Sequence, residues 1–139
     1  MKKLFLYWLI PLLFLSCLQK DNILSADIEG YYSYVSFDKN GNVIVEGWLT
    51  INFKDSTNFS GKWDFKKVGD PEDIGPQVGS GDHMGGLIGN DSLWIELNPQ
   101  FRDNNLLLIG KFKDNKIEGT WQWISFIGPT NEGEFRAEK

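Results

Sequence analysis

The sequence contains one histidine and one cysteine, and this scarcity excludes several kinds of chemistry. Zinc sites built on paired histidines are excluded, and a Ser/His/Asp triad would depend on His83 alone. Cys17 has no second cysteine with which to form an internal disulfide. His83 lies in the glycine-rich residues 79–86, where a flexible backbone would support a preorganised base poorly, so we expect a solvated loop histidine. We therefore expect no metal site and no cofactor. A glycosidase would need only two carboxylates, but Glu46, Glu96 and Glu118 fall on the face opposite the main apolar set of their strands, so we also expect no enzyme activity.

Positive charge is also scarce. Fourteen Lys and Arg residues stand against nineteen Asp and Glu residues, which gives a formal net charge of −5. Nucleic-acid binding depends on clustered cations that neutralise phosphates, and the sequence shows no basic stripe. We therefore expect no nucleic-acid partner. An acidic surface gains nothing from anionic lipids either, so attachment to a membrane would need another source.

The chain has no apolar run of the roughly 20 residues that a transmembrane helix needs. Its longest candidate, residues 4–15, is interrupted by Pro11 and follows Lys2 and Lys3. A charged start, a short apolar run and then a small residue are typical of a secretory signal. We expect residues 1–16 to be a signal peptide that is removed.

The end of this run, Phe14-Leu15-Ser16-Cys17, resembles the lipobox of bacterial lipoproteins, with phenylalanine where leucine is commoner. The resemblance implies that Cys17 is acylated, with palmitate or a similar chain, and starts the mature protein. Stable anchoring then comes from two or more acyl chains. The alternatives without lipidation are that Cys17 is removed with the signal peptide or that it stays as a free thiol near the N-terminus of the mature protein.

The lipoprotein resemblance also implies a location in a Gram-negative cell envelope. Leu18 follows Cys17, in place of the aspartate associated with inner-membrane retention, so we expect a lipid anchor in the outer membrane. Whether the protein faces the periplasm or the cell surface stays open. Residues 17–26 form the expected lipidated tether, which would keep the folded domain close to the bilayer.

From residue 27 onward the hydrophobic pattern has a period of two, which is typical of half-buried β-strands. Residues 69–90 are too long for a hairpin turn, and they contain either an eighth strand near residues 77–88 or a long mobile loop. The seven strands that the pattern predicts directly are residues 28–37, 42–53, 58–68, 91–98, 105–113, 116–127 and 132–138.

Short clusters of turn-forming residues, at 38–41, 54–57, 114–115 and 128–131, predict an antiparallel meander of neighbouring strands. A second regularity is a glycine followed two residues later by an aromatic residue. Glycine lets a sheet bend, and the nearby ring can fill the space that it leaves. We therefore predict an all-β fold, an up-and-down meander that closes into a barrel of seven or eight strands. The pairs are Gly30/Tyr32, Gly61/Trp63, Gly110/Phe112, Gly119/Trp121 and Gly133/Phe135.

The segments Gly30-Tyr31-Tyr32 near the start and Gly119-Thr120-Trp121 near the end resemble the calycins, the superfamily of lipocalins and avidins. The resemblance spans the expected domain, residues 27–139, and implies a calycin-like barrel. By analogy, it implies a binding role.

Two binding hypotheses use opposite faces of the predicted sheet. In the first, inward aromatic residues bind one small hydrophobic or aromatic ligand inside the barrel, with residues 69–90 as a lid. The alternative for this face is an interior that its own rings fill completely. The candidate ligand-binding residues are Phe53, Phe59, Trp63, Phe65, Trp121 and Trp123.

In the second hypothesis, aromatic residues on the outer barrel face bind an envelope protein, as a protein-binding or inhibitor module. The alternation of side chains along a strand places Ile44 outward and Val43 inward. It also places aromatic residues on the outward face of several strands. The alternatives are that a β-bulge reverses the parity or that the lid covers these side chains. The candidate partner-binding residues are Trp48, Trp94 and Phe126.

Overall fold

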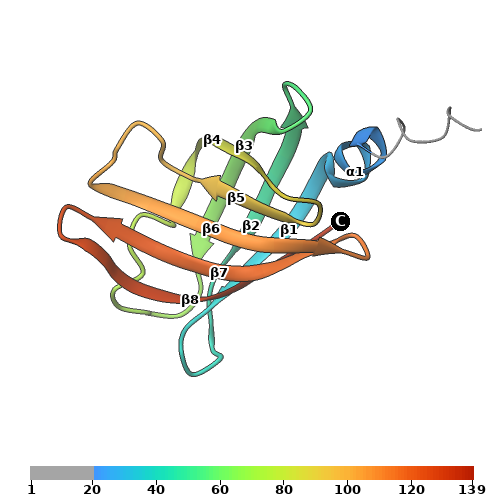
Figure 1. Cartoon of the computed structure of the whole chain (residues 1–139). Helices are drawn as coiled ribbons and strands as arrows, with labels where there is room; N and C mark the ends of the chain where they lie inside the picture. Colours follow the sequence, from blue (N-terminus) through green and yellow to red (C-terminus); the bar gives the residue numbers. More distant parts are fainter. Residues whose placement is uncertain (1–20) are drawn as a thin grey trace, which may run out of the picture.

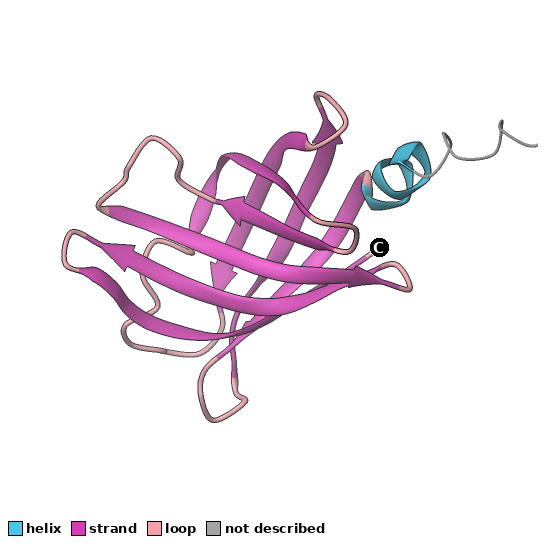
Figure 2. Cartoon of the chain, viewed as in Figure 1, coloured by secondary structure: helices cyan, strands magenta, loops and turns pink. Residues whose placement is uncertain are grey.

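The structure is a computed structural model that describes residues 21–139, with side chains from residue 25 onward. The expected signal peptide, Cys17 and the first part of the expected tether lie outside the described residues. The described chain forms one short helix and eight strands (Figures 1 and 2). They are α1 (Asp21–Ile28), β1 (Gly30–Phe37), β2 (Val43–Phe53), β3 (Asn58–Lys67), β4 (Gly79–Ile88), β5 (Ser92–Glu96), β6 (Asn104–Lys113), β7 (Lys116–Ser125) and β8 (Gly128–Glu138).

The strands form one closed antiparallel barrel in which each strand pairs with its neighbours in sequence and β8 pairs with β1. The predicted all-β meander is therefore confirmed. Strand β4 covers most of the segment where an eighth strand was one of two alternatives. The remaining residues between β3 and β4 form no strand, and they cross one end of the barrel.

Helix α1 lies beside the start of β1, at the other end of the barrel (Figure 1). The sequence pattern does not indicate this helix, because eight residues are too few to show a helical period. Its last residue, Ile28, is fully buried, and the Tyr32 hydroxyl donates a 2.5 Å hydrogen bond to the Ile28 carbonyl oxygen. The Lys139 ammonium group donates to the Asp27 carbonyl oxygen. These contacts close what we call the α1 end of the barrel.

The turn between β7 and β8 is displaced from its predicted position at residues 128–131. Strand β7 ends at Ser125 and β8 begins at Gly128, so that Phe126 and Ile127 form the turn. Gly128 has a φ of 101°, which glycine adopts without steric cost, and the Ser125 hydroxyl donates to its carbonyl oxygen at 3.1 Å. Phe126 therefore lies at a turn, and its expected place on the outer face of a barrel strand is wrong.

A β-bulge reverses the predicted parity at the start of β2. Val43 pairs with Phe37 and Val45 pairs with Ser36, which leaves Ile44 as the extra residue. Val43 is 40% exposed and Ile44 is 4% exposed. The prediction of an inward Val43 and an outward Ile44 is therefore wrong.

Aromatic rings pack against one another in the barrel interior. Tyr34 stacks on Phe65, with ring centroids 4.0 Å apart and an interplanar angle of 8°, and its centroid lies 5.8 Å from that of Phe135. The ring of Trp63 lies 5.1 Å from that of Phe65. All four residues are buried, so these rings fill the space between them, as in most small barrels.

The rings also occupy the spaces that glycines leave, but on the paired strand and not along one strand as the sequence pattern suggests. Trp121 is paired with Gly133, and its Nε1 donates a 2.9 Å hydrogen bond to the Phe37 carbonyl oxygen across that glycine. A Cβ atom on Gly133 would lie 2.7 Å from Nε1 of Trp121. Phe59 covers Gly85 on β4 in the same way. Each such contact places an aromatic ring of one strand over a glycine of the neighbouring strand.

Candidate functional site

The end of the barrel opposite α1 is crossed by residues 69–78, which we call the plug segment. Gln77 in this segment is fully buried, and Ile74 is partly buried against the core. A Cβ atom on Gly75 would lie 2.5 Å from the Trp123 ring, so the backbone passes directly over that indole. The expected lid over residues 69–90 thus divides into this plug and strand β4, which belongs to the barrel wall.

The plug is held by a small set of hydrogen bonds. Inside the barrel, the Ser36 hydroxyl donates to Oε1 of Gln77 at 2.9 Å, and Nε2 of Gln77 donates to the Ile74 carbonyl oxygen at 2.7 Å. At the rim, Nδ2 of Asn98 donates to the Pro76 carbonyl oxygen at 3.2 Å. Nδ2 of Asn131 donates to the Asp73 carbonyl oxygen at 2.8 Å. Side chains rather than a strand ladder therefore keep the plug in place.

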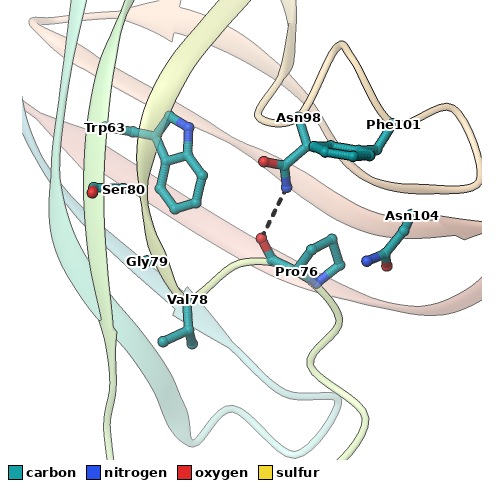
Figure 3. Close-up of a pocket in the computed structure, with 8 residues that line it drawn as sticks. All are labelled: Trp63, Pro76, Val78, Gly79, Ser80, Asn98, Phe101 and Asn104. Atoms are coloured by element: carbon teal, nitrogen blue, oxygen red, sulfur yellow. Dashed lines mark hydrogen bonds between the residues drawn. The ribbon is translucent and has the colours of Figure 1, made fainter.

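A pocket of about 260 Å³ lies between the plug and the β5–β6 loop. Figure 3 shows the Trp63 indole and the Phe101 ring on opposite sides of this pocket, with the Asn98 side chain between them and with Pro76 and Val78 below them in the view. Phe101 is 60% exposed, whereas Trp63 is almost fully buried and donates from Nε1 to the Leu97 carbonyl oxygen at 3.0 Å. Two asparagine side chains, Asn98 and Asn104, add polar groups to the lining. The pocket therefore combines aromatic walls with neutral amides.

A second depression of about 230 Å³ lies on the other side of the plug. Pro71 and Glu72 of the plug border it, together with the β1–β2 turn at Asp38 and the buried Trp121. A depression thus flanks the plug on each of two sides. The volume of each is slightly below the roughly 300–1,000 Å³ of pockets that bind drug-sized ligands.

A buried hydroxyl lies unsatisfied in the interior near the plug. Tyr34 has no hydrogen-bond partner for its hydroxyl, and its side chain is almost fully buried. Burial raises the pKa of Tyr34 far above its ordinary value, so the phenol is protonated at neutral pH. The Ser36 hydroxyl lies close enough to lower that pKa, but it donates its proton to Gln77 and makes no well-formed bond with Tyr34.

The six residues predicted to bind a ligand do not surround one cavity. Four of them are buried in the core, and two are partly buried beside it. Trp63 borders the larger pocket, and Trp121 borders the smaller one. The buried residues are Phe59, Trp63, Phe65 and Trp121, and the partly buried ones are Phe53 and Trp123.

The three candidate partner-binding residues are dispersed over the outside of the molecule. Trp48 lies on β2 and stacks on Tyr31, with ring centroids 5.6 Å apart. Trp94 lies on β5, paired with Ile109, and two strands separate it from β2. Phe126 is 89% exposed in the β7–β8 turn. The structure does not bring these residues into one patch.

The expectation of a solvated His83 is wrong, because residues 79–88 form a strand that places His83 in the interior. The side chain is 2% exposed, Nε2 lies 2.7 Å from the Thr50 carbonyl oxygen, and Nδ1 has no partner. Loss of solvation lowers the pKa of His83, and the Thr50 carbonyl and the Asp82 carboxylate offset this only in part.

The described residues contain no group of three or more His, Cys, Asp or Glu side chains placed to hold a metal ion. Within residues 21–139, no helix is long and apolar enough to cross a membrane.

Comparisons with known proteins bear on the fold. No family model matches the chain, and no curated protein matches it. Among solved structures, a redesigned β-barrel is similar, with a TM-score of 0.56 and 7% sequence identity over 84% of this chain and 94% of that one. This likeness places the chain in the class of eight-stranded antiparallel β-barrels. At such low identity it shows the fold alone.

Proposed function

We propose that the protein is a lipoprotein of the outer membrane, anchored through Cys17, whose calycin-like barrel binds a small hydrophobic or aromatic ligand at its plugged mouth. The observation that carries the ligand proposal is the pocket between Trp63 and Phe101. Its volume of about 260 Å³ suits a fragment-sized molecule. An aromatic ligand would gain about 0.5–1.5 kcal/mol from each well-placed ring contact beyond its buried area.

The charge around this pocket favours a neutral ligand. Its lining consists of aromatic, aliphatic, amide and hydroxyl groups and contains no Asp, Glu, Lys or Arg. Nδ2 of Asn98 is already bonded to the Pro76 carbonyl oxygen, whereas Oδ1 of Asn104 accepts a 3.1 Å hydrogen bond from Nε1 of Trp123 and leaves its amide NH₂ group for a ligand. The pocket thus offers a hydrogen-bond donor near two aromatic rings, which suits a small aromatic acceptor.

Calorimetric titration of the full chain in detergent micelles tests this proposal with benzamide, whose carbonyl oxygen is an acceptor, and with indole, an aromatic ring that has none. Phe101→Ser removes an exposed ring from the pocket and should weaken binding at least fivefold while leaving the melting temperature nearly unchanged. Phe126→Ser is the matched control, because it removes an even more exposed ring from a neighbouring turn. The control also corrects for partitioning of the probe into micelles. Absence of saturable binding, or equal losses in both variants, would contradict the proposal.

Lipidation is tested separately by mass spectrometry of the membrane-extracted chain. The expected product begins at Cys17 and carries acyl chains, and Cys17→Ser should leave an unprocessed, unacylated precursor. A mature chain that begins elsewhere, or that carries no acyl group, would refute the anchor and would leave the ligand proposal intact.

One observation favours the alternative of a protein-binding module. Trp94 on the outer wall is paired with the exposed Ile109, and the exposed side chains of Met84 and Ile88 lie on the same face of β4. Exposed apolar patches of this kind often mark protein contacts. A photo-crosslinking residue in place of Ile109 should then capture one envelope protein, and the same residue in place of Lys62 on β3 should not. Identical capture patterns at both positions would argue against the module.

A further inference from the structure

The plug occupies the mouth of the barrel as a bound molecule would. Two of its side chains point inward from an irregular segment: Ile74 packs on the core, and Gln77 is fully buried with its carboxamide bonded to Ser36. Glutamine is rarely buried in proteins, so its burial here depends on those specific hydrogen bonds. Ile74 and Gln77 together present a branched aliphatic group and a neutral carboxamide to the interior.

The attachment of the plug permits its release. Gly69 begins the plug and Gly79, the first residue of β4, follows it, with φ values of 69° and 127° that favour glycine. Neither has a heavy atom within 4 Å of where a Cβ would lie, so no side chain packs against the two junctions. The depressions on both sides leave room for the segment to move. No strand pairing has to break, because the plug belongs to no strand.

We propose that the plug segment is an internal ligand, and that an external molecule of the same chemistry displaces it and binds in the barrel interior. The inference rests on the proposed ligand-binding function and specifies its ligand: a small uncharged molecule that joins a branched or cyclic apolar group to a carboxamide or similar carbonyl. Its carbonyl oxygen accepts a hydrogen bond from Ser36, as Oε1 of Gln77 does in the closed form.

The unpaired Tyr34 hydroxyl is the second observation that points to a ligand. In the closed barrel this donor is buried without a partner, which costs stability. A small ligand whose carbonyl oxygen replaces Oε1 of Gln77 beside Ser36 can shift toward Tyr34 and offer it an acceptor, so that Ser36 and Tyr34 bind the carbonyl together.

The ligand must be neutral because the interior has no partner for a charge. No Asp, Glu, Lys or Arg among residues 25–139 is buried, and a desolvated carboxylate or ammonium group would remain uncompensated.

Closure of the plug also lowers the apparent affinity for the ligand, because only the fraction of molecules with an open plug can bind it. Loosening the plug should therefore tighten binding.

The experiment uses cyclohexanecarboxamide, with the anionic cyclohexanecarboxylate of nearly the same shape as the control ligand. In the full chain, the double variant Ile74→Ala/Gln77→Ala vacates the interior and keeps Pro76 and Val78 in the outer pocket. We expect at least tenfold tighter binding of the amide to this variant than to the wild type, and no saturable binding of the carboxylate. Asp70→Ala, an exposed substitution in the same segment, should bind as the wild type does.

Tyr34→Phe provides the second test, because it should weaken amide binding at least fivefold without lowering the melting temperature. If the double variant does not fold, Gln77→Ala alone should still tighten binding severalfold. Binding by the wild type that is unchanged or weaker in the plug variants overturns the internal-ligand inference and leaves binding in the outer pocket intact. Absence of binding of indole, benzamide and the amide to every variant overturns the proposed function as well.

Discussion

Nε2 of His83 lies 2.7 Å from the carbonyl oxygen of Thr50, within the space that Gly61 leaves between β2 and β4. Gly61 belongs to β3, the strand between them, and a Cβ atom there would lie 1.7 Å from the Thr50 oxygen and 2.6 Å from Nε2. The bond therefore ties two strands that are not neighbours, through the interior of the barrel. It uses the Nε2 proton of a neutral imidazole, since Nδ1 has no partner.

Stability should fall on acidification because of His83. Its pKa in the folded state lies below the ordinary value of 6.5, so the unfolded chain binds more protons once the pH falls below about 6.5. The contribution of the neutral side chain is complete above that pH and is lost as the pH falls toward the folded-state pKa. Urea unfolding between pH 8 and pH 5 measures this effect. His83→Gln should remove most of the slope near pH 6, and an unchanged slope would mean that other groups cause it.

Gly61→Ala should destabilise the barrel by about 3 kcal/mol or more, because the added methyl group meets backbone that cannot shift without breaking the barrel wall. The control is Ser60→Ala on the outer face of the same strand, which should change the free energy of unfolding by less than about 0.5 kcal/mol. Chemical denaturation of both variants provides the comparison. A Gly61→Ala variant as stable as the wild type would contradict the close approach of the Thr50 carbonyl oxygen to Gly61.

Removal of the hydroxyl group should affect the free energy of unfolding differently at two nearby tyrosines, Tyr32 and Tyr34. Tyr32 donates to the Ile28 carbonyl oxygen, and Tyr32→Phe should cost about 1 kcal/mol. The Tyr34 hydroxyl is buried without a partner, and Tyr34→Phe should leave the free energy of unfolding unchanged or raise it by about 1–3 kcal/mol. Thermal unfolding of the matched pair decides this, and a loss of stability in Tyr34→Phe would reveal a partner for that hydroxyl.

Asp55 should titrate well below an ordinary aspartate. Hydrogen bonds from the Asn58 side chain and from the Thr57 and Asn58 backbone lower its pKa from 3.8 to about 2. The unfolded chain therefore takes up the proton first, so the stabilising contribution is complete above pH 4 and is lost between pH 4 and pH 2. NMR titration of the Asp55 carboxyl carbon should give a midpoint of about 2. A midpoint near 3.8 would show that the turn is open in solution.

The sequence alone was sufficient to predict seven of the eight strands and their order, because alternation of side chains and short turns are local features. The weak eighth strand was harder to identify, since β4 is rich in glycine and lacks the usual alternation. The reversal of Val43 and Ile44 was not predictable in detail, because a single extra residue in one strand leaves no mark in the hydrophobic pattern.

The candidate site was less predictable than the fold. The inward aromatic residues were recognised, but their mutual contacts depend on which strands close the barrel. Gln77 and Tyr34 were missed because a glutamine in a glycine-rich segment and a tyrosine in a strand read as ordinary surface and core residues. The only local signal was Ser36, a polar residue on the inward face of β1. His83 was misplaced for a similar reason, because its glycine neighbours suggested a loop.

The most direct measurement of the central claim is hydrogen exchange of the plug backbone, residues 69–78, in the full chain with and without saturating cyclohexanecarboxamide. Displacement of the plug predicts that ligand accelerates exchange in this segment, while the amides of β6 and β7 keep or increase their protection. Unchanged or slower exchange in the plug at saturation would contradict displacement, because the ligand would then bind with the plug still in place.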